Sequence, residues 1–246
     1  MPARRPGNEM NDEGTIQMWR IAIKLAGEGG QGVGLAAAVL AEAALASGHE
    51  VTMLQSYGPE ARGGASSADV VVSNRQVANP KVIEADLLLV LNQTSWDKFA
   101  RAPWRTPKTV VVAEEGRVHL DGSPPGGSTP GGSTGGGSTP GLLALPFERL
   151  AREELREKVA ANMLAAGAVG ALVGCLTSSS LVEAGLARSP AAFRVVNRQA
   201  IERGWRLVTD SPDLVSLRGM LARLGAPVLD ENDLDENDLA VLVGTP

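Results

Sequence analysis

A cluster of glycines between an apolar stretch and an alanine-rich stretch most constrains what this chain can fold into. Residues 27–34 read Gly-Glu-Gly-Gly-Gln-Gly-Val-Gly. The preceding stretch, 19–26, is apolar and alternates only weakly, which is typical of a strand buried on both faces of a sheet. Alanines and leucines then recur over 31–47 with no breaker after Gly34, which predicts a helix. The sequence therefore predicts an α/β fold with 19–26 as its central strand.

This glycine turn is suited to binding an anion, because glycine lets backbone amides approach closely and the following helix offers its positive end. Its spacing also matches the dinucleotide fingerprint G-x-G-x-x-G. An NAD site, however, has an acid at the end of the second strand to hold the ribose hydroxyls, and here that strand ends in Gln55 and Ser56. We therefore expect an anionic ligand or a partner surface at the turn. A turn that serves only for close packing stays open as an alternative.

The next strands predict a mixed sheet. A second strand at 49–55 completes a βαβ unit and is expected to run parallel to the first. The connection from it to a strand at 67–73 is too short for a parallel crossover, so this third strand is predicted to be antiparallel to its predecessor. Further predicted elements are a helical turn at 82–85, a strand at 87–91, a short helix capped by Thr94, and a strand at 109–113 with 118–120 as its candidate hairpin partner.

The predicted fold class is therefore α/β, with a Rossmann-like, mixed, mostly parallel sheet flanked by helices. The C-terminal part reads as helical, at 147–154, 157–176, 180–186 and 190–203. In the last of these, Ser189 is the expected N-cap and Gly204 the expected stop.

A loop rich in Gly and Pro follows the second strand and contains a candidate anion-binding arginine. Arg62 precedes Gly63 and Gly64, so a planar guanidinium would lie beside exposed amides, an arrangement suited to phosphate or carboxylate. A solvated surface arginine is the alternative. Tyr57, the only tyrosine of the chain, begins the same loop and either stacks or packs.

Composition divides the chain into a core domain and appendages. The range 122–141 contains Gly-Gly-Ser-Thr three times, so we expect a disordered insertion there, with a domain linker as the alternative. Residues 1–18 are predicted to be a disordered N-terminus, 19–208 the α/β domain, and 209–246 a helical and acidic C-terminal extension. The extension lacks the glycine and final glutamate of an EF-hand loop, so it reads as a solvated acidic surface.

Charge and cysteine content exclude several classes of function. The 246 residues include 23 Lys and Arg against 28 Asp and Glu, a net charge of -5, so neither nucleic acid nor a membrane surface is an expected partner. A polar start without an apolar leader segment favours a cytoplasmic protein. The single cysteine, Cys175, cannot ligate an iron-sulfur cluster alone and reads as a small buried apolar residue. His49 and His119 are isolated, and no catalytic set or metal site is evident.

These motifs together resemble a known family. The glycine turn, the loop Tyr57-Gly58-Pro59-Glu60-Ala61-Arg62-Gly63-Gly64 and the segment 91–99 (Leu-Asn-Gln-Thr-Ser-Trp-Asp-Lys-Phe) occur in the order seen in the gamma subunit of 2-oxoacid:ferredoxin oxidoreductases. The segments around Asn162-Met163 and 197–204 are also similar to that family. The resemblance covers about residues 19–208, while the insertion at 122–141 and the acidic tail depart from the family pattern.

The resemblance implies a multi-subunit enzyme that decarboxylates a 2-oxoacid on thiamine diphosphate, reduces ferredoxin through iron-sulfur clusters and forms an acyl-CoA. It favours 2-oxoglutarate as the substrate, over branched-chain 2-oxoacids or pyruvate. Thiamine diphosphate, magnesium and the clusters would belong to alpha and beta subunits and a candidate ferredoxin-like delta subunit, so this chain alone would hold no cofactor and would be inactive.

By this interpretation the chain would complete the coenzyme A region of a shared active site and contribute no catalytic or metal-binding residue. The predicted cofactor-binding residues are Gly27, Gly29, Gly30, Gln31, Gly32, Tyr57, Arg62, Gly63 and Gly64. Two alternatives remain: a stand-alone Rossmann-type dinucleotide-binding oxidoreductase, and a purely structural assembly subunit.

Overall fold

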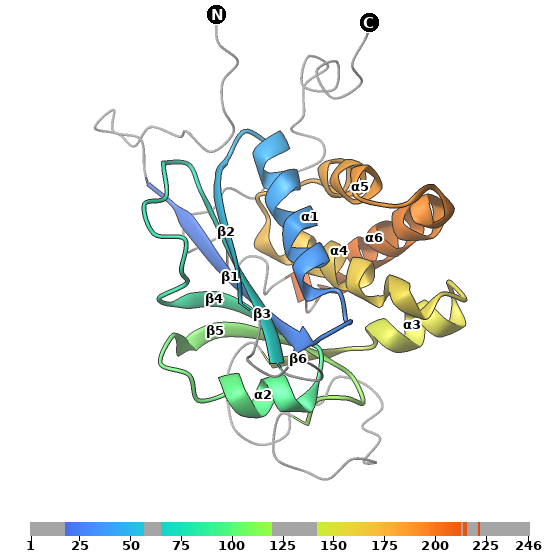
Figure 1. Ribbon diagram of the computed structural model, residues 1–246, viewed down its shortest axis with the longest axis horizontal. Helices are drawn as coiled ribbons and strands as arrows, with labels where there is room; N and C mark the ends of the chain where they lie inside the picture. Colours follow the sequence, from blue (N-terminus) through green and yellow to red (C-terminus); the bar gives the residue numbers. More distant parts are fainter. Residues whose placement is uncertain (1–17, 57–64, 120–141, 213, 216–220, 222–246) are drawn as a thin grey trace, which may run out of the picture.

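A six-stranded mixed sheet forms the centre of the molecule in the computed structural model (Figure 1). The structure describes residues 18–56, 65–119, 142–212, 214–215 and 221. The strand order is β2-β3-β1-β4-β5-β6. The strands are β1 Arg20–Glu28, β2 Glu50–Ser56, β3 Ala65–Ser73, β4 Ala85–Val90, β5 Arg105–Glu114 and β6 Leu142–Leu145. The predicted fold class is confirmed. The segment 122–141 lies outside the described residues, as do residues 1–17 of the predicted disordered N-terminus 1–18.

Strand β3 is the only antiparallel member of the described sheet. It pairs antiparallel with β1 on one side and with β2 on the other, whereas β4, β5 and β6 add in parallel. Strands β1 and β2 therefore point the same way with β3 between them. The prediction of an antiparallel third strand is confirmed, as are the parallel direction of the second strand and the central place of the first.

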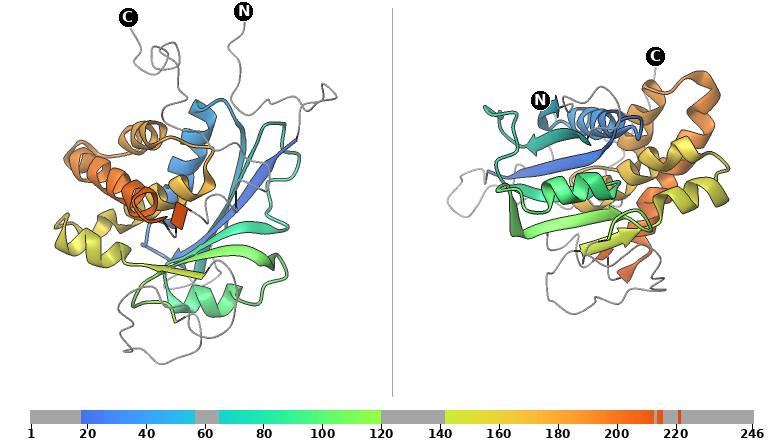
Figure 2. Two further views of the ribbon diagram at one scale, coloured as in Figure 1. Left: turned by 180° about the vertical axis from the view of Figure 1, so that it is seen from behind. Right: turned by 60° about the horizontal axis from the view of Figure 1, so that its bottom comes forward.

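Helices cover both faces of the sheet, but more of them lie on one face than on the other. Helices α1, α4, α5 and α6 group on one face, and α2 lies on the other (Figure 2). Ile21, Ile23 and Leu25 of β1 join the larger core with the four helices, whereas Ala26 packs with Trp96 of α2. The helices are α1 Val33–Ala46, α2 Gln93–Phe99, α3 Phe147–Glu153, α4 Ala161–Val173, α5 Ser178–Ala187 and α6 Arg194–Thr209.

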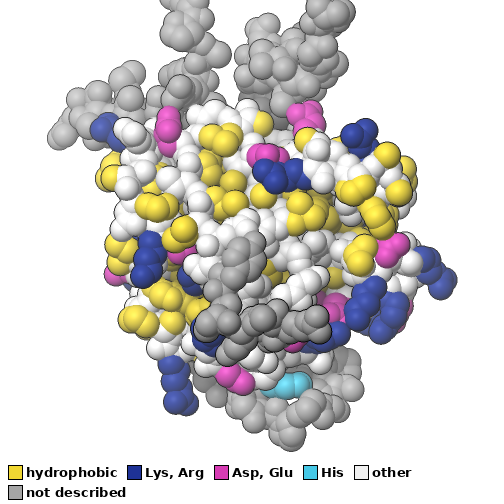
Figure 3. Space-filling view, in the orientation of Figure 1, with side chains coloured by type: hydrophobic (Ala, Val, Ile, Leu, Met, Phe, Trp, Pro, Cys, Tyr) yellow, Lys and Arg dark blue, Asp and Glu magenta, His cyan; other side chains and the backbone are white. Residues whose placement is uncertain are grey.

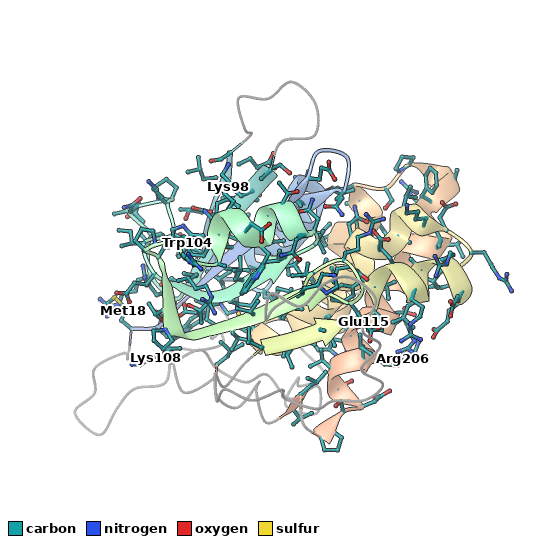
Figure 4. The ribbon with its side chains drawn as sticks, turned by 90° about the horizontal axis from the view of Figure 1, so that it is seen from below. Met18, Lys98, Trp104, Lys108, Glu115 and Arg206 are labelled. Carbon is teal, nitrogen blue, oxygen red and sulfur yellow. The ribbon has the colours of Figure 1, made fainter. Side chains whose placement is uncertain are left out.

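The far face of β1 carries a buried ion pair. Lys24 of β1 bonds to its cross-strand neighbour Asp69 of β3, and the ammonium lies 5.0 Å from the ring centroid of Trp104. The second oxygen of Asp69 accepts the backbone N–H of Val82 at 3.0 Å. Trp104, Met18 and Lys108 mark this end of the sheet in Figure 4, and Glu115 lies at the opposite end. The charged pair thus ties the two central strands to the loop before β4.

Glycines allow α4 and α6 to pack with backbones almost in contact. A Cβ on Gly204 would lie 2.0 Å from the carbonyl oxygen of Leu164, and one on Gly167 would lie 2.2 Å from that of Ile201. The predicted stop at Gly204 is therefore wrong. Gly204 lies inside α6, which continues to Thr209. Its lack of a side chain gives α4 the space to pack closely.

Other local predictions are also corrected. The expected helical turn at 82–85 is absent, because the N–H groups of Val82 and Ala85 bond to Asp69 and Trp104. Val118 is in a turn that bonds to the Glu114 carbonyl, so 118–120 forms no hairpin over its described residues. The predicted helix 157–176 is a 3₁₀ turn at Lys158–Ala160 followed by α4, which ends before the left-handed Gly174. The predicted helix 190–203 likewise starts with a 3₁₀ turn at Ala191–Phe193 before α6. The N-cap of α2 is Asn92 in place of Thr94.

Among the described residues, no helix is both long enough and apolar enough to cross a lipid bilayer.

The glycine contact between α4 and α6 leads to a stability prediction. Alanine normally favours a helix over glycine, but in Gly204→Ala the added methyl group would collide with the Leu164 carbonyl. We expect the free energy of unfolding to fall by about 1–3 kcal/mol, the usual range for overpacking, in chemical denaturation of the isolated chain. Gln199→Ala, at an exposed position of the same helix, should stay within about 0.5 kcal/mol of wild type. Equal stability of Gly204→Ala and wild type would contradict this packing.

Candidate functional site

The glycine turn lies where the chain connections of the sheet change direction. Strands β1 and β4 are parallel neighbours, yet α1 carries the chain from β1 toward β2, and α2 carries it from β4 toward β5 on the other face. In open α/β sheets, ligands bind in the crevice outside the carboxyl ends of such strands. In Figure 1 the arrowhead of β1 ends at the turn that leads into α1. The topology therefore places the predicted turn at the usual ligand-binding position of such folds.

The backbone of the turn needs glycine at two positions. The N–H of Gln31 donates to the Glu28 carbonyl at 3.1 Å, which closes a tight turn over Gly29 and Gly30. Gly30 has φ 93° and Gly32 has φ 74°, both in the region that disfavours other residues. The turn thus depends on the local conformational freedom of these two glycines.

The glycines of the turn divide into packed and open ones. A Cβ on Gly27 would lie 2.6 Å from Val33, and one on Gly32 would lie 2.0 Å from the Asn162 amide nitrogen. Gly34 faces Gln55 of β2, whose amide would be 3.0 Å from an added Cβ. By contrast, no atom of the described residues lies within 4 Å of a Cβ on Gly29 or Gly30, and both are exposed. Only this open part of the turn can receive a ligand or a partner.

The first turn of α1 has no side-chain cap. Gly32 is its N-cap, and within the described part of the chain no side-chain cap hydrogen bond is formed there. These N–H groups have no partner within the helix and carry partial positive charge. An uncapped helix end beside open glycine amides is an arrangement that suits an anion.

The side chain of Gln31 bonds within the protein. Its Oε1 accepts the N–H of Glu28 at 2.7 Å and the Nδ2–H of Asn92 at 3.2 Å. Its Nε2 donates to the Leu91 carbonyl at 3.2 Å. Gln31 thus joins the turn after β1 to the segment that follows β4.

The loop that contains Tyr57, Arg62, Gly63 and Gly64 lies outside the described residues, so these four residues stay predictions. Its two ends are described. Ser56 pairs with Ser67, and Ala65 pairs with Glu28 at the carboxyl end of β1. The loop therefore leaves and re-enters the sheet at the same edge as the glycine turn.

Comparison with known proteins identifies the family of the chain. The model of the family described as pyruvate ferredoxin/flavodoxin oxidoreductase matches residues 22–207. The chain belongs to this family. It is a gamma subunit of a 2-oxoacid:ferredoxin oxidoreductase, which confirms the resemblance seen in the sequence.

Individual relatives agree with this assignment. The 2-oxoglutarate synthase subunit KorC of Methanocaldococcus jannaschii is 34% identical over 192 residues, covering 78% of this chain and 95% of that subunit. The gamma subunit of a keto/oxoacid ferredoxin oxidoreductase from Geobacter sulfurreducens has a TM-score of 0.61 and 29% identity, covering 80% of this chain and 98% of that chain.

A further solved structure shows the fold alone. The 2-oxoglutarate:ferredoxin oxidoreductase of Magnetococcus marinus has a TM-score of 0.62 and 21% identity, covering 79% of this chain and 32% of that chain.

In this gamma subunit the structure adds a residue to the site that the sequence did not predict. Asn162, in the first turn of α4, packs against Gly32. The two residues are far apart in the sequence, and no spacing rule relates them. The similarity of the Asn162-Met163 segment to the family is its only signal in the sequence.

Glu114 is a second residue that the sequence did not predict. It ends β5 with 2% of its surface exposed, and its two carboxyl oxygens lie 3.2 and 3.1 Å from the backbone nitrogen of Glu148 in α3. Burial raises the pKa of Glu114 to about 8, against the Glu148 N–H and the charge of Arg117, which lower it. The nearby carboxylates of Glu148 and Glu115 raise it further. Glu114 is therefore mostly protonated at neutral pH.

His49 and Cys175 are buried and contact other residues of the protein. The Nε2 of His49 lies 2.9 Å from the Cys175 carbonyl oxygen, and its ring meets Trp19 edge-on. Burial lowers the pKa of His49 and raises the pKa of the Cys175 thiol to about 12. Cys175 is buried, as predicted, and its protonated thiol is unsuited to nucleophilic chemistry. Within the described ranges, no group of three or more His, Cys, Asp or Glu side chains could hold a metal ion.

The environment of Glu114 leads to a pH prediction. The pKa of Glu114 in the folded chain is higher than the ordinary value of about 4.5, so its favourable contribution to stability is complete below about pH 4.5 and is lost as pH rises through about 8. Glu114→Gln mimics the protonated acid. We expect this variant to gain stability over wild type by up to about 1.4 kcal/mol per pH unit between pH 6 and 8, measured by denaturant unfolding.

The control for this experiment is Glu115→Gln, which changes an exposed carboxylate next in the chain. Its stability should differ from wild type by less than about 0.5 kcal/mol at each pH. A difference between Glu114→Gln and wild type that stays constant across this pH range would show that Glu114 ionises normally.

Proposed function

We propose that this chain is the gamma subunit of a thiamine-diphosphate-dependent 2-oxoglutarate:ferredoxin oxidoreductase, and that its glycine turn completes the coenzyme A region of the shared active site. The observation that carries the proposal is the open turn. Gly29 and Gly30 are exposed beside an uncapped helix at the carboxyl ends of β1 and β4. The KorC relative, named as a 2-oxoglutarate synthase subunit, supports 2-oxoglutarate as the substrate.

The residues of the turn suit an anionic coenzyme. Coenzyme A carries phosphate groups, which bind well to helix N-termini and to arginine. Gly29 and Gly30 have no side chain that would block close approach of a phosphate to the backbone. In this proposal Arg62, with Tyr57, Gly63 and Gly64, contacts the same coenzyme from the neighbouring loop.

The remaining cofactors are assigned to partner subunits. The sequence has one cysteine, too few for an iron-sulfur cluster, and its thiol is buried. Thiamine diphosphate, magnesium and the clusters would therefore be held by alpha and beta subunits, with a ferredoxin-like delta subunit as a further candidate and ferredoxin as the electron acceptor. When bound, thiamine diphosphate would supply the decarboxylation chemistry.

The surface of α1 and β2 supports assembly with other subunits. Leu45 of α1 is 58% exposed, and Met53 and Leu54 of β2 are 37% and 38% exposed. Strand β2 is at the end of the described sheet, so one side of it has no neighbouring strand there. Figure 3 shows hydrophobic side chains on the face that carries these elements. Exposed apolar side chains along a sheet edge favour contact with another protein.

A purely structural role of the turn is the second candidate function. It is favoured by the packing of Gly27, Gly32 and Gly34 against neighbouring side chains. It does not account for the exposed Gly29 and Gly30. The stand-alone dinucleotide enzyme is less well supported, because Gln55 at the end of β2 packs against Gly34 where an acid would be needed.

The test of the proposed function blocks the open part of the turn. Gly29→Val adds bulk where none of the described residues lies within 4 Å, and it needs no positive φ, so the fold should tolerate it. In the reconstituted complex, we expect the apparent KM for coenzyme A to rise about tenfold or more, equivalent to about 1.4 kcal/mol of lost binding. The assay follows reduction of ferredoxin or a viologen with 2-oxoglutarate as the substrate.

Two further comparisons sharpen this test. Arg62→Ala should raise the same KM, whereas Arg101→Ala, at an exposed arginine after α2, and Ala192→Val, at an exposed alanine before α6, should leave it unchanged. If Gly29→Val and Arg62→Ala both assembled and kept the wild-type KM for coenzyme A, the site assignment would be wrong. A substrate panel of 2-oxoacids on the same complex tests the preference for 2-oxoglutarate.

A further inference from the structure

The glycine turn needs a restraint beyond its own backbone hydrogen bond to keep one shape. Glycine loses more conformational freedom on folding than any other residue, so a turn with adjacent glycines is intrinsically costly to order. Within the turn itself, the backbone provides one bond, from the Gln31 N–H to the Glu28 carbonyl. Exposed Gly29 and Gly30 have no side chains to pack. The restraint must therefore come from side-chain hydrogen bonds.

The side chain of Gln31 supplies this restraint from inside the turn. Its Oε1 holds the N–H of Glu28 at 2.7 Å, and its Nε2 bonds to the Leu91 carbonyl at 3.2 Å. The N–H of Leu91 in turn donates to Ala26 of β1 at 3.0 Å. Gln31 thus extends the β1–β4 pairing beyond the last paired residues and fixes both ends of the tight turn.

Asn92 connects the same network to α2. Its Nδ2 donates to Gln31 Oε1 at 3.2 Å, while its Oδ1 caps α2 by accepting the N–H of Ser95 at 2.8 Å. One asparagine therefore orients the Gln31 amide and begins the helix on the opposite face of the sheet. Such connected polar groups act as a unit, so losing one member weakens the others.

We propose that Gln31 is a positioning residue, held by Asn92, that keeps the Gly29 and Gly30 amides directed outward for coenzyme A. This inference rests on the proposed function and assigns Gln31 a role other than the ligand contact that the sequence predicted. Three of its side-chain hydrogen-bonding positions are used within the protein. Its effect on the ligand is therefore exerted through the backbone of the turn.

The first test removes the side-chain bonds of Gln31 in the assembled complex. In both Gln31→Ala and Gln31→Met, of which the second keeps the side-chain length, we expect the apparent KM for coenzyme A to rise about fivefold to tenfold, as for loss of a few hydrogen bonds. The KM for 2-oxoglutarate should stay within about twofold of wild type. A general loss of structure would instead lower kcat and change both KM values together.

The second test separates positioning from direct contact. Asn92→Ser keeps a good N-cap for α2 but loses the donor to Gln31. It should raise the KM for coenzyme A in the wild-type background and add little in the Gln31→Met background, because both changes break one unit. If the fold-changes in the KM for coenzyme A multiplied in the double variant, the two residues would act independently. That result would overturn the positioning role and indicate that Gln31 contacts the ligand itself.

The outcomes also separate this inference from the proposed function. If Gly29→Val raises the KM for coenzyme A while Gln31→Ala and Gln31→Met do not, the positioning role is wrong and the proposed site stands. If none of these variants changes the KM, both the site and the role of Gln31 are wrong.

Discussion

Strand β1 is the element on which the rest of the structure depends, because it is hydrogen-bonded on both sides and buried on both faces. It pairs with antiparallel β3 along its whole length and with parallel β4 near its carboxyl end. Ile21, Ile23 and Leu25 are fully buried under the main helical layer, and Lys24 on the other face is neutralised by Asp69. A strand held this firmly gives the glycine turn at its end a rigid base.

Much of this arrangement could be predicted because it depends on local sequence. Glycine content predicted the strand-to-helix turn, and the short connection after Gln55 predicted that β3 is antiparallel. Errors arose where distant residues determine the outcome. Gly204 has the sequence properties of a helix stop, but the backbone of α4 passes beside it and requires a glycine within the helix. Thr94 is a reasonable cap by type, yet Asn92 caps α2.

The candidate site shows the same division. Local pattern identified the turn, but it could not show that Gly27 and Gly32 are packed while Gly29 and Gly30 are open. For Gly32 that distinction depends on Asn162 of α4, which the fold brings to the turn, whereas Gly27 packs on Val33 of the turn itself. The raised pKa of Glu114 likewise depends on burial beneath α3. Residues that act through long-range contacts are therefore the ones that the sequence missed.

The charges around the turn favour a site shared between subunits. The turn contains Glu28, a carboxylate that opposes the approach of an anion, and the raised pKa of Glu114 reduces the negative charge at the same edge of the sheet. Backbone amides and a helix end provide partial charges only, each contributing about 0.3–1 kcal/mol at an exposed position. Binding of a multiply charged coenzyme needs full positive charges as well. In the proposed site, Arg62, which the sequence places between β2 and β3, would supply one such charge. The chain as a whole has a net charge of -5, so in the proposed site the remaining positive charge would come from a partner subunit.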